Sequence, residues 1–144
     1  MKPLSLTLKN FGPYINETID FTKFEDSSLF LISGKTGSGK TTIFDGMSYA
    51  LFGESSGKLR LGKEMRSTFA DPSEATEVTL LFKHNEYLYE LNRLPEQELF
   101  KKRGTGVRKQ SAKISLIVKD AQGKELRAYS KRREVDELIQ ELLH

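Results

Sequence analysis

The sequence predicts an α/β fold in which a buried strand, a glycine-rich turn and a helix are joined to an antiparallel β segment. Three observations lead to this prediction. Residues 29–32 form a short apolar run that ends at glycines, as in a strand buried on both faces. From about Lys40, apolar residues recur at helical spacing. Alternating apolar residues over 78–82 and 87–91 then flank a polar break, which is typical of a β-hairpin.

Strands are expected before the glycines. Residues 4–8 alternate between leucine and polar side chains, which indicates a half-buried strand. After the turn signal Gly12-Pro13, residues 18–21 predict a second short strand. The first helix, with Ile43, Phe44, Met47, Ala50 and Leu51 as its apolar residues, is expected to end at Gly53.

Beyond that helix the sequence predicts mainly β structure and one more helix. Residues 53–73 are expected to be irregular and 95–111 a long polar loop, with a strand over 114–118 and a turn over 120–124. Ser130 is expected to cap a final helix. Its apolar face consists of Val135, Leu138, Ile139 and Leu142. The expected division is 1–53 (strands, glycine turn and helix), 54–129 (mainly β) and 130–144 (amphipathic helix).

Composition and charge limit the classes of function. No apolar run approaches the roughly 18 residues of a membrane span, and the absence of cysteine excludes disulfides and thiolate metal sites, so a cytoplasmic location without membrane contact is expected. The formal net charge is +3, but residues 101–133 carry 12 basic and only 2 acidic side chains. The positive charge is therefore concentrated in one stretch.

The glycine-rich turn matches a phosphate-binding motif. Residues 34–41 fit the pattern G-x-x-x-x-G-K-[ST] without a mismatch, between a buried strand and a helix. Glycines let successive N–H groups point at phosphate oxygens, and the helix directs its positive dipole end at the same anion. The sequence therefore predicts a site for ATP with Mg²⁺. The expected nucleotide-binding residues are Gly34, Lys35, Thr36, Gly37, Ser38, Gly39, Lys40, Thr41 and Thr42.

Within this loop, Lys40 is expected over the β- and γ-phosphates and the Thr41 hydroxyl is expected to be a Mg²⁺ ligand. Hydrolysis also needs a second acid at the end of a later apolar strand and a residue that orients water. The only candidate strand runs to Asp120, but Lys119 interrupts it and no second acid follows. We therefore expect nucleotide binding without a complete set of catalytic residues.

The basic stretch predicts contact with nucleic acid phosphates. A glycine-containing segment carries five cations, and a second cluster spans 131–133; a solvated loop and a charged helix end are the alternative interpretation. Sequence-independent binding to DNA would follow from counterion release. The candidate DNA-binding residues are Lys101, Lys102, Arg103, Arg108 and Lys109.

Other candidate residues favour structural roles. Phe11 and Tyr14 are expected to pack in the core rather than stack on adenine, and Asp45 to pair or pack on its helix rather than act in catalysis. His84 and His144 lack a nearby acidic cluster with the spacing of metal ligands.

Three segments resemble one known family. Residues 6–14 (Leu-Thr-Leu-Lys-Asn-Phe-Gly-Pro-Tyr) with 19–21, residues 29–53, and the pieces 65–67 and 89–93 are similar to the N-terminal part of the bacterial SbcC family. Members of this family are the large ATPase subunits of SbcCD nucleases, and they are related to DNA-repair ATPases of the structural-maintenance-of-chromosomes (SMC) type.

This resemblance implies the N-terminal lobe of an ABC-type P-loop ATPase head. The coiled coil, zinc hook and C-terminal lobe of such proteins are absent from the sequence, and Gln140 lacks the flanking strand expected of the glutamine loop. ATP would be hydrolysed only with the C-terminal lobe and in a dimer of two heads. The implied function is ATP-dependent exonuclease and endonuclease action on double-stranded DNA, with an SbcD-type nuclease subunit, in DNA repair, recombination and replication.

The alternative function is a small P-loop kinase that phosphorylates a metabolite. Such an enzyme needs an acceptor-binding acid and an arginine-bearing lid of helices, whereas the segment after the first helix reads mainly as β. A GTPase would need the string Asn-Lys-x-Asp, which does not occur. A transporter ATPase would show its glutamine loop and signature after the first helix.

Overall fold

The structure is a computed structural model that describes residues 1–23, 40–53 and 72–143. For residues 40–42 it describes the backbone only. The expected strand over 29–32 and the expected irregular segment over 54–71 lie outside the described residues.

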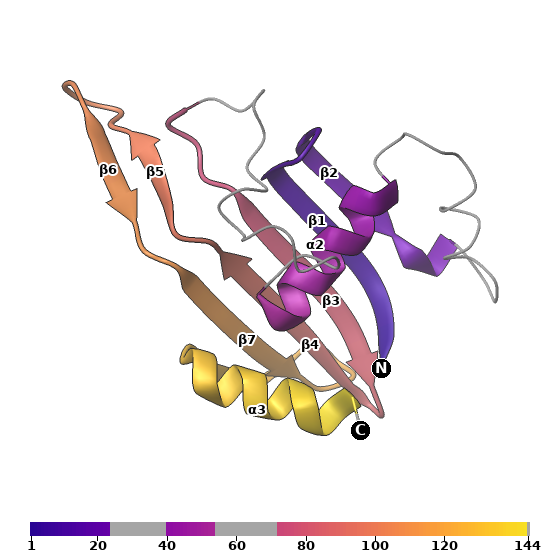
Figure 1. Ribbon diagram of the computed structural model, residues 1–144. Coiled ribbons are helices and arrows are strands. Elements are labelled where there is room, and N and C mark those ends of the chain that lie inside the picture. Colours follow the sequence, from indigo (N-terminus) through magenta and orange to yellow (C-terminus); the bar gives the residue numbers. More distant parts are fainter. Residues whose placement is uncertain (24–39, 54–71, 144) are drawn as a thin grey trace.

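The centre of the described fold is a six-stranded antiparallel sheet with the strand order β2-β1-β3-β4-β7-β8 (Figure 1). The predicted strands over 4–8 and 114–118 and the predicted β3–β4 hairpin are confirmed. Residues 18–21 were expected to form a short strand, but β2 is longer and Phe21 begins a short 3₁₀-helix, η1 (Phe21–Lys23). The sheet strands are β1 (Lys2–Phe11), β2 (Tyr14–Asp20), β3 (Glu77–His84), β4 (Tyr87–Leu94), β7 (Lys113–Lys119) and β8 (Glu125–Tyr129).

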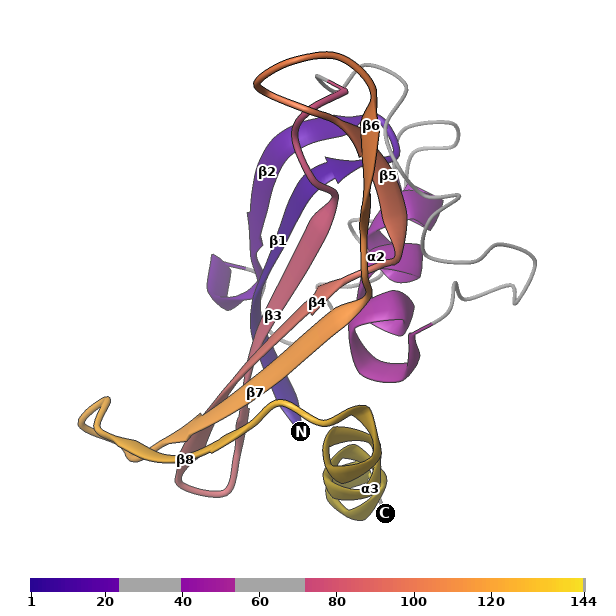
Figure 2. The same cartoon turned by 90° about the vertical axis from the view of Figure 1, so that its left-hand side faces the viewer.

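The two α-helices of the described residues lie on the same side of this sheet (Figure 2). They are α2 (Lys40–Phe52) and α3 (Arg132–Leu143), and each places apolar residues in the core. The α3 face predicted from the sequence is confirmed, since Val135 and Ile139 are buried and Leu138 and Leu142 pack against the core. The fully buried residues of the six-stranded sheet are Leu6, Leu8, Phe11, Val78, Leu80, Phe82, Leu91 and Leu116.

Two glycines fit α2 to the sheet. A Cβ atom at Gly46 would lie 2.7 Å from Cδ2 of Leu8, so the helix approaches β1 more closely than a larger residue would permit. Gly53 has a φ of +81° and donates its N–H to the Tyr49 carbonyl over 2.7 Å. The predicted glycine end of this helix is thus confirmed.

The prediction of a long polar loop over 95–111 is wrong, because this segment contains a second hairpin. Strands β5 (Gln97–Phe100) and β6 (Val107–Gln110) pair with each other, and the pair Gln97↔Gln110 continues the register of Leu94↔Lys113. Pro95 has no N–H to donate, which explains an interruption of the ladder at that point. The β5–β6 hairpin therefore extends the β4–β7 pair beyond the main sheet (Figure 1).

The expected cap of the final helix is off by one residue. Helix α3 begins at Arg132, and the Lys131 carbonyl accepts the N–H of Val135 over 3.1 Å. Lys131, not Ser130, therefore occupies the capping position. Among the described residues, no helix is long and apolar enough to cross a membrane.

Candidate phosphate-binding helix and basic hairpin

The described part of the predicted phosphate site is the helix that follows it. Helix α2 begins at Lys40, where the sequence places the end of the glycine motif. Residues 34–39 lie outside the described residues, and the side chains of Lys40, Thr41 and Thr42 are not described. The described residues therefore show how α2 is held against the sheet.

The N-terminal part of α2 is fixed by burial. Ile43 is 8% exposed and Asp45 is 4% exposed, while Gly46 lies against Leu8 of β1. The burial of Asp45 agrees with the expected packing role. Because this face of the helix is enclosed, its packing orients the helix axis relative to the sheet.

The aromatic residues near the β1–β2 turn pack in the core, as expected. Phe11 is fully buried, and its ring centroid lies 6.2 Å from that of Tyr49 on α2. Tyr14 is the cross-strand partner of Phe11 and packs against the same core. Burial, together with the nearby Glu17 carboxylate, raises the pKa of Tyr14.

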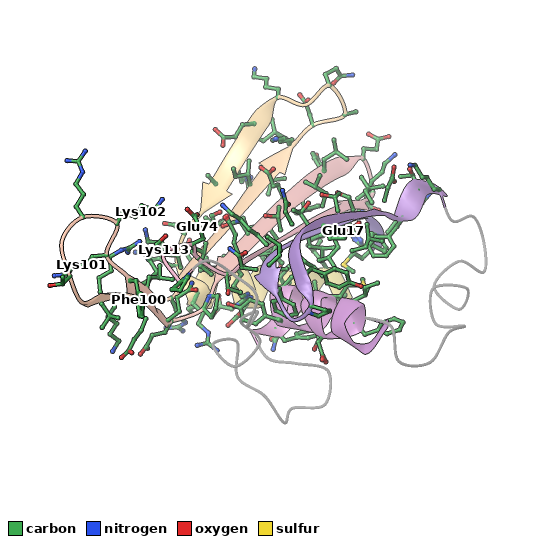
Figure 3. All side chains as sticks on the ribbon, turned by 90° about the horizontal axis from the view of Figure 1, so that it is seen from above. Glu17, Glu74, Phe100, Lys101, Lys102 and Lys113 are labelled. Atoms are coloured by element: carbon green, nitrogen blue, oxygen red, sulfur yellow. The ribbon has the colours of Figure 1, made fainter. Side chains whose placement is uncertain are left out.

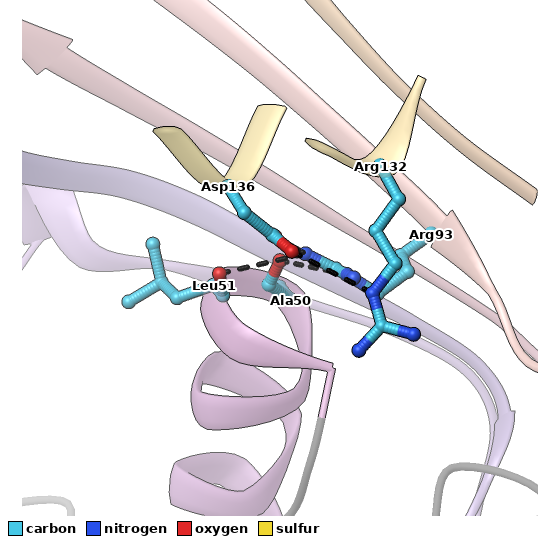
Figure 4. Close-up of polar contacts among 5 residues, drawn as sticks. All are labelled: Ala50, Leu51, Arg93, Arg132 and Asp136. Atoms are coloured by element: carbon cyan, nitrogen blue, oxygen red, sulfur yellow. Dashed lines mark hydrogen bonds and ion pairs between the residues drawn. The ribbon is translucent and has the colours of Figure 1, made fainter. Parts of the chain in front are cut away.

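Arg93 on β4 holds the C-terminal end of α2 (Figure 4). Its Nε donates to the Ala50 carbonyl over 3.0 Å and its Nη2 to the Leu51 carbonyl over 3.4 Å. These carbonyls belong to the last turn of the helix, where no intrahelical N–H remains for them. A cation at this end also complements the helix dipole.

The same guanidinium reaches α3. Nη2 of Arg93 lies 3.7 Å from Oδ1 of Asp136, and Oδ2 of Asp136 lies 3.5 Å from Nε of Arg132. The Arg93 guanidinium also lies 5.9 Å from the centroid of the Tyr49 ring. Burial lowers the pKa of Arg93, and Asp136 and Tyr49 oppose that shift. The pKa of Tyr49, in contrast, is raised by burial. Arg93 thus joins β4, α2 and α3.

Sequence reasoning missed Arg93, although the pattern contained a signal. Tyr89, Leu91 and Arg93 occupy successive inward positions of β4, and all three are buried. A charged residue at a core position of a strand requires partners within the protein. The alternation itself could therefore have marked Arg93 as a structural cation.

A second buried polar cluster was also missed, and it ties β5 to β1. The Gln97 side chain accepts the Thr76 N–H over 2.8 Å and donates to the Thr76 carbonyl over 3.2 Å. The Thr76 hydroxyl donates to the Asn10 carbonyl over 2.7 Å, and the Asn10 amide donates to the Ala75 carbonyl over 2.9 Å. Asn10 has a φ of 52°, a conformation that asparagine tolerates better than most residues.

A hollow of 340 Å³ lies beside Arg93. It is bordered by Tyr49 and Gly53 of the α2 end, by Lys113 of β7 and by Arg132 of α3. This hollow is at the opposite end of α2 from Lys40, so it does not coincide with the predicted phosphate site.

The β5–β6 hairpin carries the five candidate DNA-binding residues: Arg108 and Lys109 lie on β6, and the other three lie in the turn, where Figure 3 labels Lys101 and Lys102. Nζ of Lys102 lies 3.1 Å from Oε1 of Glu74, and Nζ of Lys109 lies 3.0 Å from Oε1 of Glu96. Within the described part of the chain, Lys101 and Arg103 make no ion pair. Both surface ion pairs are exposed and can exchange partners at little cost.

The tip of this hairpin is a defined turn, not a loose loop. The Lys101 N–H donates to the Gly106 carbonyl over 3.0 Å, and Gly104 and Gly106 have positive φ values of 81° and 98°. Phe100 is 57% exposed, and the exposed Val107 is its cross-strand partner. In the second cationic cluster, over residues 131–133, two arginines form ion pairs along α3. Nε of Arg133 lies 3.1 Å from Oε1 of Glu137, and Nε of Arg132 lies 3.5 Å from Oδ2 of Asp136.

Asp120, the acid weighed as a catalytic candidate, has a structural role. Oδ1 of Asp120 accepts the N–H groups of Gln122 and Lys124, each over 2.9 Å, so this carboxylate stabilises the β7–β8 turn. His84 is the last residue of β3, Gln140 is exposed on α3, and His144 lies outside the described residues. No group of three His, Cys, Asp or Glu residues that could hold a metal occurs in the described part of the chain.

Comparisons with known proteins agree with the predicted fold class. The family model described as AAA domain matches residues 5–143. The SbcC subunit of nuclease SbcCD from Lactococcus lactis subsp. lactis (strain IL1403) is 50% identical over 119 residues, which are 81% of this chain and 11% of that protein. The SbcC subunit from Vibrio cholerae serotype O1 is 46% identical over 127 residues, 88% of this chain and 12% of that protein.

A third relative, the SbcC subunit of nuclease SbcCD from Staphylococcus aureus (strain JH9), is 54% identical over 93 residues, 65% of this chain and 9% of that protein. The chain thus spans only about a tenth of the length of these relatives. A solved chain described as "Structural biochemistry of ATP-driven dimerization and DNA stimulated activation of SMC ATPases" is 18% identical, with a TM-score of 0.48 over 99% of this chain and 80% of that chain. That likeness is too distant to support a conclusion. The match over residues 5–143 shows that this chain belongs to the AAA domain family.

Proposed function

We propose that this chain is the ATP-binding half of the ATPase head of an SbcCD-type nuclease, an ATP-dependent exonuclease and endonuclease of double-stranded DNA. One observation carries the proposal. The motif over 34–41 runs into a helix that begins at Lys40 and is fixed against the sheet, in a chain 46–54% identical to the SbcC subunits of three SbcCD nucleases.

The proposed ligand is ATP with Mg²⁺. The backbone from Gly34 to Gly39 would surround the phosphates, Lys40 would place its charge over the β- and γ-phosphates, and Thr41 would hold the metal, with Thr42 as a further phosphate contact. The described helix fits this ligand because its first turn follows the glycines directly and its axis is fixed by Gly46 against Leu8. Bound Mg²⁺ would neutralise phosphate charge at this position.

Hydrolysis is proposed to need the rest of the head. Within the described residues, the Asp120 carboxylate already serves a turn, and β7 pairs antiparallel with β4 and β8. The chain would therefore bind nucleotide, and its own C-terminal lobe and a second head would complete the site. The proposed division of the chain remains 1–53, 54–129 and 130–144, and the proposed location remains cytoplasmic.

The proposed partners are double-stranded DNA and an SbcD-type nuclease subunit. The β5–β6 hairpin would supply DNA contacts through Lys101, Lys102, Arg103, Arg108 and Lys109. The contact would be independent of sequence, because exposed lysine and arginine side chains recognise phosphates by charge.

The test is Mg-ATP hydrolysis by this chain alone and after mixing with the separately produced C-terminal lobe. We expect no turnover by the chain alone and turnover on mixing, which Lys40→Ala abolishes. Robust turnover by the chain alone would contradict the proposal. Phosphate transfer from ATP to a small metabolite would support the kinase alternative, but the described segment after α2 consists of strands and offers no lid of helices over residues 72–129.

A further inference from the structure

Arg93 is placed where two helices that are distant in the sequence meet. It donates to the carbonyls of Ala50 and Leu51 at the end of α2 and lies 3.7 Å from Asp136 on α3. Its side chain is 6% exposed, so these contacts are protected from bulk solvent. Figure 4 shows the guanidinium between the end of α2 and the start of α3.

The fit around this guanidinium is close. A Cβ atom at Gly53 would lie 3.0 Å from Nη1 of Arg93 and 3.7 Å from Nη2 of Arg132. Oδ1 of Asp136 is buried and has no hydrogen bond within the described residues, so the carboxylate is balanced by the Arg93 charge at Oδ1 and by the Arg132 charge at Oδ2. A shift of the α2 end would therefore disturb the environment of Asp136.

The other end of α2 is the proposed phosphate site. The helix has 13 residues, which gives a length of about 20 Å. A regular helix moves as a rigid element, so a change at its first turn displaces its last turn as well. Arg93 is the described group that touches both the last turn of α2 and an acidic residue of α3.

We propose that Arg93 is a positioning residue that makes the docking of α3 depend on nucleotide binding at the start of α2. The signal runs from the first turn of α2 through its last carbonyls to Arg93, and from Arg93 to Asp136. This inference rests on the proposed function, since it needs ATP to bind at the motif over 34–41.

The test is hydrogen exchange of α3 amides in this chain, measured with and without saturating Mg-ATP, alongside a direct titration of nucleotide affinity. We expect Mg-ATP to slow exchange in α3 about fivefold, the lower end of common coupling strengths. Asp136→Asn removes the charge on α3, so we expect it to bind Mg-ATP as tightly as the wild type and to lose the slowing. Arg93→Lys keeps the charge, but the lysine side chain has a single nitrogen in place of the guanidinium fork. We expect this variant to lose the slowing too.

Glu137→Gln is the matched control. Glu137 is the next residue on α3, is exposed, and pairs with Arg133 rather than with Arg93. This variant changes the same charge and should keep the slowing. Exchange measured without nucleotide supplies the baseline of each variant, so a generally looser helix is separated from a lost response.

Two results would overturn the inference while the proposed function stands. One is Mg-ATP binding without any change in α3 exchange in the wild type. The other is equal slowing in the wild type and Asp136→Asn. An absence of Mg-ATP binding would refute the proposed function and this inference together.

Discussion

Arg93 and the β5–β6 hairpin show two opposite uses of positive charge in one small fold. Arg93, taken as a whole residue, is 5% exposed, and its guanidinium is surrounded by helix carbonyls, a tyrosine ring and a carboxylate. The lysines of the hairpin stand in solvent, where Lys102 and Lys109 pair with exposed glutamates. A buried cation must be satisfied by the protein itself, whereas an exposed cation can exchange its partner for a ligand.

This difference separates structural from binding roles more clearly than charge content does. Removing a buried charge leaves its partners unsatisfied, so the cost appears in folding. Removing an exposed charge leaves folding nearly unchanged, so any cost appears in binding.

Arg93→Met should destabilise the chain by about 3 kcal/mol. The substitution keeps much of the apolar stem but leaves Asp136 and the Ala50 and Leu51 carbonyls without the cation, and breaking a buried pair typically costs 3–5 kcal/mol. Asp136 is partly exposed, which places the expected value at the lower end. Urea unfolding followed by circular dichroism measures it. A loss below about 1 kcal/mol would show that Arg93 is dispensable for folding.

Gln97→Ala should destabilise by about 2 kcal/mol. The buried N–H of Thr76 loses its acceptor, and an unsatisfied buried donor costs roughly 1–3 kcal/mol. Glu98→Ala is the matched control, because Glu98 is exposed on the same strand and should change the free energy of unfolding by less than about 0.5 kcal/mol. Equal losses in both variants would contradict the role given to the buried cluster.

The double variant Lys101→Gln, Arg103→Gln should fold normally and bind DNA less tightly. If both cations contact phosphates, the salt dependence of the logarithm of the binding constant should become shallower by about 1.8, or roughly 0.9 per phosphate. Fluorescence anisotropy on duplex DNA between 50 and 200 mM salt, the range over which about six contacts would cost roughly a thousandfold, measures this slope. The same slope in wild type and variant would exclude these residues from DNA contact.

Lys109→Gln should change the free energy of unfolding by less than about 0.5 kcal/mol. Its ion pair with Glu96 is exposed on both sides, and such pairs contribute little. Thermal unfolding at low and at 0.5 M salt provides the check. A loss above about 1 kcal/mol would show that the hairpin depends on this pair, contrary to the comparison with Arg93.

The predicted parts of the fold were those with a strong local pattern. Helix α2 and the β3–β4 hairpin were predicted from apolar residues at regular spacing, and this prediction needed no information on long-range contacts. The β5–β6 hairpin was missed because its strands have four residues each and β6 carries mostly polar side chains. Its pairing continues that of β4 and β7, which local sequence does not reveal.

The phosphate motif and the role of Arg93 differ in the same way, because only the motif depends on local sequence. The phosphate motif was predicted in full because its chemistry is local, and its side chains lie outside the described residues, so it stays a prediction. The role of Arg93 depends on carbonyls more than 40 positions away in the sequence and on Asp136 in another helix. No local pattern could name those partners, although the alternation of β4 marked the position as buried.

Direct titration of Mg-ATP into this chain tests the central claim, that nucleotide phosphates bind at the start of α2. The comparison is between wild type, Lys40→Ala and Lys9→Ala, which removes the same charge from an exposed position of β1. We expect Lys9→Ala to bind like the wild type and Lys40→Ala to bind at least about tenfold more weakly, because a charge-assisted contact is worth roughly 1.5–3 kcal/mol. Equal affinity in all three proteins would contradict the account.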